Sequence, residues 1–308
     1  MLEARGSFTK RKREACVDVA LTLTIPVMNW KHFYLRRSPL LLLALLSGCA
    51  SLPSPEQRRT AADALAKAQG WQLNFIAASP FTLMSYAPAR QLRAQHLTVY
   101  IEGDGLAWVT KDLPSRDPTP LHPQALQLAL AQPSGNVAYL GRPCQYVDAA
   151  STGCAQRYWT EKRFAPEVID ATNAALDHLK QQFGARNLTL VGYSGGASVA
   201  LLSAARRLDV TQVITVAGNL DHRAWTTFHR VRPLDGSLDP ADESDALRTV
   251  PQVHFAGERD RTIPPSLIEN YASRFKGPVP ITVVLLPGFD HQCCWVQSWP
   301  KLWRQAVQ

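Results

Sequence analysis

The sequence predicts an α/β fold, with a doubly wound, mostly parallel sheet and helices on both of its faces. Short apolar runs of strand length alternate along the chain with longer segments of helical periodicity, which is the pattern of βαβ units. The 308 residues are 46% hydrophobic and 19% charged, so the chain can bury a large core, and wholesale disorder is excluded. No internal repeat or domain boundary is evident after residue 49.

The expected strands are short, apolar and bounded by turn residues, as strands buried on both faces are. They cover residues 71–77, 81–86, 97–101, 136–140, 188–191, 213–216, 250–256 and 281–286. The expected helices cover residues 54–66, 124–131, 164–183, 196–208 and 292–306. Residues 218–248 are polar and contain two prolines, so we expect an irregular insertion over the carboxyl edge of the sheet.

The first and last helices carry the clearest local signals. Ser54-Pro55-Glu56-Gln57 predicts a helix start, with Ser as the N-cap, Pro at the first helical position and Gln completing a capping box. In the last helix, Trp295, Trp299 and Trp303 recur at helical spacing and are expected to pack on the sheet. Pro300 is expected to kink or break that helix.

The positive charge of the chain is concentrated at its N-terminus. Of the 33 basic and 25 acidic residues, eight basic but only three acidic ones lie in residues 1–49. In the rest of the chain the two signs nearly balance and are scattered, so the net charge of +8 does not indicate a nucleic-acid partner.

Residues 28–48 have the features of a secretory signal peptide. Lys31, Arg36 and Arg37 precede an apolar run over residues 40–46, which is far shorter than the roughly 20 residues of a membrane-spanning helix. Met28 stands where a start codon is expected, so we interpret residues 1–27 as an over-called start; a genuine extended leader is the alternative.

The end of this run, Leu46-Ser47-Gly48-Cys49, resembles the lipobox of bacterial lipoproteins. The resemblance implies cleavage before Cys49 and attachment of lipid to that cysteine. It also implies a protein that is lipid-anchored in the bacterial cell envelope and faces the periplasm. The functional domain is then residues 50–308. A buried helix that ends in a chance cysteine is the alternative interpretation.

Apart from Cys16 and Cys49, four cysteines remain, and an exported protein can pair them. Cys144 and Cys154 bracket a short loop and are the favoured pair. Cys293 and Cys294 are adjacent; they can bridge each other, stay free or pair with the other two, and the sequence does not choose among the three connectivities. No Cys/His spacing indicates zinc, and we expect no cofactor and no metal.

A G-x-S-x-G motif marks the candidate nucleophile. Gly192-Tyr193-Ser194-Gly195-Gly196 lies between an expected strand and an expected helix. A nucleophile on such a tight turn needs residues without side chains two positions before and after it, and the helix N-terminus then faces the reaction centre. A glycine-rich structural turn is the alternative interpretation.

With this motif the chain resembles the α/β-hydrolase fold over residues 71–308, in which the catalytic serine is followed by an acid and then a histidine. The resemblance implies a catalytic Ser194, with its acid in Gly257-Glu258-Arg259-Asp260 and its base in the loop after the last strand. Asp260 is the chosen acid and Glu258 the alternative. His291 is the chosen base, and His222 and His254 are weaker candidates.

The resemblance also implies an oxyanion hole. One donor is the backbone N–H of Gly195, and the other is that of Asp104 or Gly103, in the loop after the strand over 97–101. Glu102 and Asp104 beside a developing negative charge are unfavourable unless they are neutralised. Arg142 can pair with one of them; alternatively, Glu102 points away and caps a loop.

Together these residues indicate a serine hydrolase that cleaves a carboxylic ester-like bond of a small acyl substrate through an acyl-enzyme. Thioesterase, peptidase and acyltransferase chemistry would use the same groups. A non-catalytic, hydrolase-fold binding lipoprotein is the alternative from another class. Three tryptophans in loops near the expected site either line an acyl pocket or pack the loops: Trp108, Trp159 and Trp225. The oligomeric state is not predicted.

Overall fold

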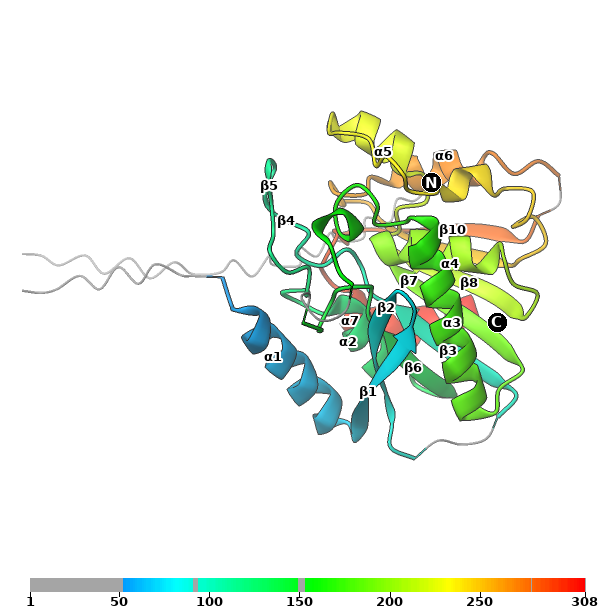
Figure 1. The fold of residues 1–308 in the computed structure, drawn as a ribbon. Helices are drawn as coiled ribbons and strands as arrows, with labels where there is room; N and C mark the ends of the chain where they lie inside the picture. The colour runs from blue at the N-terminus through cyan, green and yellow to red at the C-terminus, as the bar shows by residue number, and fades with distance from the viewer. Residues whose placement is uncertain (1–51, 91–93, 149–152, 278, 308) are drawn as a thin grey trace, which may run out of the picture. The chain divides into compact units, whose positions relative to one another are not determined.

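The computed structural model describes residues 52–90, 94–148, 153–277 and 279–307. The expected leader and Cys49, the expected site of lipidation, lie outside these residues. The described chain forms an eight-stranded sheet in the order β1-β2-β6-β3-β7-β8-β9-β10 (Figure 1). Strand β2 runs antiparallel to both of its neighbours, β1 and β6, and the strands from β6 to β10 in this order are parallel. The expected doubly wound, mostly parallel sheet is therefore confirmed.

Each strand expected from the sequence forms. The main sheet contains β1 (Trp71–Ala78), β2 (Phe81–Pro88), β3 (His96–Ile101), β6 (Asn136–Leu140), β7 (Asn187–Tyr193), β8 (Val210–Val216), β9 (Gln252–Gly257) and β10 (Ile281–Leu286). A separate hairpin, which the sequence did not indicate, contains β4 (Trp108–Thr110) and β5 (Leu113–Pro114).

The helices are α1 (Pro55–Ala68), α2 (Gln124–Leu130), α3 (Pro166–Phe183), α4 (Gly195–Ala204), α5 (His222–His229), α6 (Pro265–Ala272) and α7 (Trp295–Ala306), with 3₁₀ turns η1 (Gln156–Tyr158) and η2 (Pro240–Asp242). The capping box at the start of α1 is confirmed, because the Ser54 side chain accepts from the N–H of Gln57 and the Gln57 side chain accepts from the N–H of Ser54. Helix α7 continues through Pro300 rather than breaking there.

The sheet separates two apolar cores. One core packs against α3, α4 and α6, and the other against α1, α2 and α7; α3 and α4 lie in front of the sheet in Figure 1. Neighbouring strand residues point to opposite cores, as Val99 and Tyr100 do in β3. The tryptophans of α7 are buried as expected, and Trp299 donates from Nε1 to the hydroxyl of Tyr100 at 2.8 Å.

The segment 218–248 is less irregular than the sequence indicates. It contains α5, whose N-cap Asp221 accepts from the N–H of Ala224 at 2.8 Å, and η2. Helix α6 was also not expected. Helices α5 and α6 are eight residues long, and helices this short depend on tertiary contacts that a sequence pattern does not contain.

Two disulfides are present, and one of them is the pair expected from the sequence. Cys144 is bonded to Cys154, and Cys293 to Cys294, so the adjacent cysteines bridge each other.

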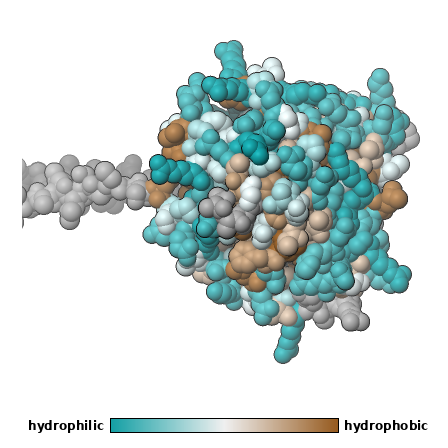
Figure 2. Space-filling model, in the orientation of Figure 1, coloured by the Kyte–Doolittle hydropathy of each residue, from teal (hydrophilic) through white to brown (hydrophobic). Residues whose placement is uncertain are grey.

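The face drawn in Figure 2 is mainly hydrophilic, with smaller apolar areas between the polar side chains. Within the described residues, no helix has the length and apolar character that crossing a membrane requires.

Candidate active site

Ser194 occupies a strained turn between the end of β7 and the start of α4. Its backbone has φ 51° and ψ −120°, a region that residues with a side chain rarely adopt. Its N–H donates to the carbonyl of Val216 at 3.0 Å, and its carbonyl accepts from the N–H of Asn219 at 3.0 Å. These bonds to β8 and to the loop after it hold the turn in place.

The glycines on either side of Ser194 are required by backbone contact. A Cβ on Gly192 would lie 2.5 Å from the Cα of Ala197, and a Cβ on Gly196 would lie 2.5 Å from the carbonyl oxygen of Glu102. Both distances are far below van der Waals contact, so the turn can form only with glycine at these two positions. This is the steric demand inferred from the motif.

Three side chains from different loops meet at the carboxyl edge of the sheet. Because β7, β9 and β10 are parallel, the residues that follow them lie at the same edge. His291 places Nε2 3.1 Å from Oγ of Ser194 and Nδ1 2.8 Å from Oδ2 of Asp260. The structure therefore brings Ser194, His291 and Asp260 into one hydrogen-bonded chain.

The acid of this group is held firmly. Asp260 is 3% exposed, and its Oδ1 accepts from the N–H groups of Thr262 and Ile263, each at 2.8 Å. The loops that carry the acid and the histidine touch, since a Cβ on Gly257 would lie 2.7 Å from the carbonyl oxygen of Phe289. These contacts fix the orientation of the carboxylate toward the imidazole.

His291 is oriented by its backbone as well as by Asp260. Its carbonyl accepts from the hydroxyl of Tyr193 at 2.9 Å and from Nε1 of Trp295 at 3.2 Å. The rings of Tyr193 and His291 lie 5.4 Å apart between centroids. The His291 side chain is 19% exposed, so one edge of the imidazole remains open to a substrate.

The alternative acid and bases do not join this group. Glu258 is exposed, next to the buried Asp260. His222 begins α5 and lies 3.7 Å from Asp239, while His254 lies inside β9 with Nδ1 2.9 Å from the hydroxyl of Thr215. Burial lowers the pKa of His254 to about 3, so this imidazole stays neutral.

The candidate oxyanion donors differ in availability. The N–H of Gly195 is the first of α4 and has no carbonyl partner within the helix. The N–H of Gly103 donates to Oε1 of Glu102 at 2.9 Å, so it is already engaged. Among the described residues, the N–H of Asp104 has no acceptor, so Asp104 remains the candidate for the second donor.

The Glu102 side chain accepts hydrogen bonds from nearby backbone N–H groups and pairs with no arginine among the described residues. This agrees with the expectation that Glu102 points away and caps a loop. Its Oε1 also accepts from the N–H of Ala125 in α2 at 3.3 Å, and Tyr139 donates its hydroxyl to Oε2 at 3.1 Å. Burial raises the pKa of Glu102 to about 7 despite these hydrogen bonds.

Asp104 is paired with two arginines, one of which the sequence indicated. Nη1 of Arg142 lies 3.3 Å from Oδ1, and Nη1 of Arg163 lies 2.7 Å from Oδ2. Burial alone would raise the pKa of Asp104, but Arg163 and Arg142 bring it below its usual value. Arg163 was not predicted, because it is 59 residues from Asp104 and belongs to no motif.

The structure places Trp225 in α5 and Trp108 in β4 rather than in loops, and Trp159 and Trp225 each donate a hydrogen bond to loop backbone. Trp159 is buried and donates from Nε1 to the carbonyl of Ser115 at 3.1 Å. Trp225 donates from Nε1 to the carbonyl of Thr262 at 2.8 Å, beside the acid loop. Trp108, in β4, is 37% exposed.

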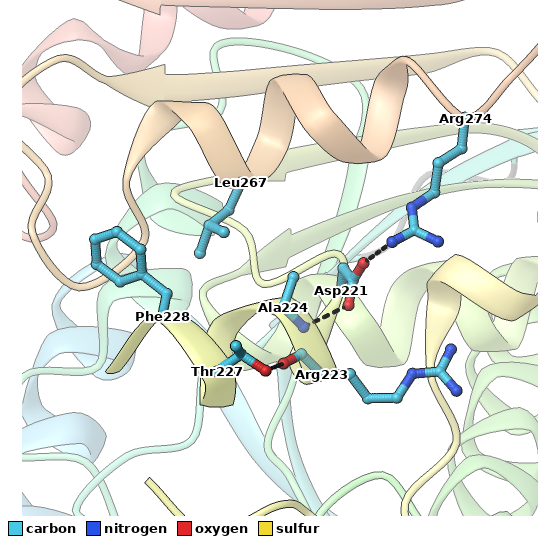
Figure 3. Close-up of a pocket in the computed structure, with 7 residues that line it drawn as sticks. All are labelled: Asp221, Arg223, Ala224, Thr227, Phe228, Leu267 and Arg274. Carbon is cyan, nitrogen blue, oxygen red and sulfur yellow. Dashed lines mark hydrogen bonds and ion pairs between the residues drawn. The ribbon is translucent and has the colours of Figure 1, made fainter. Parts of the chain in front are cut away.

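A surface cavity of about 570 Å³ lies between α5 and α6 (Figure 3). Its lining residues are Asp221, Arg223, Ala224, Thr227, Phe228, Leu267 and Arg274. Arg274 and Asp221 form an ion pair of 2.5 Å there. The residues that line the cavity do not include Ser194, His291 or Asp260.

Within the described part of the chain, no group of three or more His, Cys, Asp or Glu is placed to hold a metal ion.

Comparison with solved structures identifies the fold. The chain is similar to Est1E from Butyrivibrio proteoclasticus, with a TM-score of 0.53 and 14% identity over 76% of this chain and 98% of that one. It is similar to the esterase Pf2001 from Pyrococcus furiosus, with a TM-score of 0.53 and 13% identity over 78% of this chain and 90% of that one.

An α/β serine hydrolase homologue from Coxiella burnetii is also similar, with a TM-score of 0.50 and 14% identity over 77% of this chain and 95% of that one. No sequence model of a protein family matches the chain, and no curated protein sequence matches it. These likenesses show that the chain has the α/β-hydrolase fold, as the motif and residue order predicted.

The raised pKa of Glu102 makes stability depend on pH. Between the ordinary pKa of 4.5 and about 7, the folded protein holds a proton that the unfolded chain releases, so stability falls as the pH rises through this window. We expect the free energy of unfolding of the parent to drop between pH 5 and pH 8, relative to Glu102→Gln, by on the order of 2 kcal/mol. Urea denaturation of both proteins across this range measures the difference, and parallel curves would contradict the assignment.

Proposed function

We propose that this chain is a serine hydrolase that cleaves a carboxylic ester-like bond through an acyl-enzyme intermediate. The observation that carries the proposal is the hydrogen-bonded chain from Ser194 Oγ through His291 to Asp260, with separations of 3.1 Å and 2.8 Å. It lies on a strained turn at a helix N-terminus, which is the arrangement that nucleophilic serine chemistry needs. The fold shared with a protein named as an esterase and with another named as an α/β serine hydrolase homologue supports the same reaction class.

In the first half-reaction, Ser194 Oγ attacks the substrate carbonyl carbon while Nε2 of His291 accepts the hydroxyl proton. The carbonyl electron pair moves to oxygen, and the N–H groups of Gly195 and Asp104 bind the resulting oxyanion. When the tetrahedral species collapses, the carbon–oxygen bond to the leaving group breaks and His291 returns the proton to the departing alcohol. Asp260 holds the imidazole in the required tautomer and stabilises its charged form.

In the second half-reaction, a water molecule takes the place of the alcohol. His291 removes a proton from this water, which attacks the acyl carbon, and the bond to Ser194 Oγ breaks as the proton passes back to Ser194. The products are a carboxylic acid and free enzyme. Thioester or amide cleavage and acyl transfer differ only in the leaving group or the acceptor, so a substrate panel decides among them.

We also propose that Cys49 carries lipid and anchors the 50–308 hydrolase domain to the cell envelope, facing the periplasm. The support is the sequence of residues 28–49: a basic segment, an apolar run of signal-peptide length, and Leu46-Ser47-Gly48-Cys49 at its end. Two disulfides in the domain agree with an oxidising compartment.

A fluorophosphonate probe tests the proposed nucleophile directly, because it forms a covalent bond with an activated serine. We expect the purified 50–308 segment to be labelled at Ser194 and to hydrolyse short-chain esters, and Ser194→Ala to do neither. Mass spectrometry of the labelled protein and an ester panel measure these outcomes. An unlabelled parent would reject the hydrolase proposal in favour of a non-catalytic binding role.

Substitution of the buried Asp260 tests whether it, rather than the exposed Glu258, is the acid that orients His291. Asp260→Asn keeps the shape but removes the charge that selects the histidine tautomer, so we expect kcat to fall by about 10⁴-fold with little change in KM. Glu258→Gln, the matched control two residues away, should stay within about twofold of the parent. Steady-state ester kinetics measure kcat and KM of both variants. If kcat fell further in Glu258→Gln than in Asp260→Asn, Glu258 rather than Asp260 would be the catalytic acid.

The lipid anchor is tested in the full chain expressed in a bacterial host. We expect the parent to fractionate with membranes and to incorporate labelled palmitate. Cys49→Ser removes the sulfur that accepts the lipid, so this variant should lose the label. Retention of the palmitate label in Cys49→Ser would contradict attachment at this cysteine.

A further inference from the structure

A nearly buried cluster of three charged side chains lies beside the candidate oxyanion hole. Asp104 bridges the guanidinium groups of Arg142 and Arg163, at 3.3 Å and 2.7 Å. The two arginine side chains are only 5% and 6% exposed, and that of Asp104 is 21% exposed. The three residues come from the loops after β3, after β6 and before α3, so folding alone brings them together.

The carboxylate of this cluster packs against the residue that follows the nucleophile. A Cβ on Gly195 would lie 2.5 Å from Cγ of Asp104 and would overlap its carboxylate oxygens. The N–H of this same glycine is the first candidate oxyanion donor. A lone negative charge at this place would oppose an oxyanion, because charge interactions are strong where water is largely excluded.

The arginines are held by more than Asp104. Nε of Arg163 donates to the carbonyl of Thr160 at 2.6 Å, and Nη2 of Arg142 donates to the carbonyl of Arg163. The guanidinium of Arg142 also lies 5.2 Å from the ring centroid of Phe164. Each arginine therefore has anchors that remain when the Asp104 carboxylate is removed.

The cluster carries one more positive than negative charge. Each guanidinium group carries one positive charge, whereas Asp104 contributes a single negative charge. Glu102, in the same loop, is bonded to backbone N–H groups and to Tyr139 and forms no ion pair with either arginine within the described residues. The Asp104 carboxylate packs against Gly195, so the cluster lies next to the residue whose N–H is the first candidate donor.

We propose that Arg142 and Arg163 are positioning residues of the oxyanion hole. They hold the Asp104 loop so that its N–H faces the reacting oxygen, and their excess positive charge outweighs the Asp104 carboxylate as the oxyanion forms. This inference rests on the proposed hydrolase function and adds to it the electrostatic support of the transition state. It explains why a carboxylate is tolerated next to the nucleophile.

The inference is tested by changing the charge of the cluster in steps. Arg163→Met leaves the Asp104 carboxylate balanced by a single arginine, so we expect kcat to fall by about 10²-fold with KM within about threefold. Replacing the carboxylate as well, in Asp104→Asn/Arg163→Met, restores the excess positive charge and should raise kcat about 10-fold above that of Arg163→Met. Arg163→Lys, which keeps the charge, should retain most of the parent kcat.

Arg207→Met is the matched control. The Arg207 side chain is 8% exposed and pairs with Asp177 and Asp209, but it lies before β8, at the edge of the sheet opposite Ser194. Its loss should lower stability and leave kcat unchanged. Rates are measured with short-chain esters and divided by the number of sites titrated to completion with fluorophosphonate, so that misfolded protein is not counted.

A double variant no faster than Arg163→Met would overturn the proposal, because the carboxylate would then not be what the arginines offset. An unchanged kcat in Arg163→Met would overturn it as well. Failure of the proposed function gives a different result: a parent that neither binds fluorophosphonate nor hydrolyses esters rejects the hydrolase and this inference together.

Discussion

The hydroxyl of Ser194 is presented at the sheet edge because backbone packs directly on backbone on both sides of it. Gly192 contacts the start of α4, and Gly196 contacts the carbonyl of Glu102 at the end of β3. A methyl group at either position would push α4 away from the sheet. The position of Ser194 relative to His291, and the direction of the first N–H groups of α4, depend on this contact.

Parallel strands supply the rest of the arrangement. Ser194 and His291 are 97 residues apart and Asp260 and His291 are 31 apart, yet each follows a strand whose carboxyl end lies at the same edge. The acid and histidine loops then support each other, since the N–H of Arg259 donates to the carbonyl of Phe289 at 2.8 Å. The sheet brings the three loops together, and contacts between the loops set the hydrogen-bond distances.

Two carboxylates separated by one residue show how environment decides the state of a buried acid. Within the described residues, the donors that bond to Glu102 are all uncharged, and burial raises its pKa to about 7. For Asp104, burial acts in the same direction but two arginines outweigh it, so its pKa falls below its usual value. The charge beside the nucleophile therefore depends on Arg142 and Arg163, which are distant from Asp104 in the sequence.

The sequence by itself determined the alternation of strands and helices, the capping box of α1 and the tight turn at Ser194. These features depend on short-range periodicity and local sterics, which neighbouring residues encode. The choice of Asp260 and His291 came instead from the resemblance to the α/β-hydrolase fold. It also carries the prediction of a lipidated Cys49. Only the tertiary structure decided the pairing of Cys293 with Cys294, the engagement of the Gly103 N–H, the short helices α5 and α6, and the place of Arg163. Each of these depends on which of several possible partners the folded chain brings into contact, and residue spacing does not contain that information.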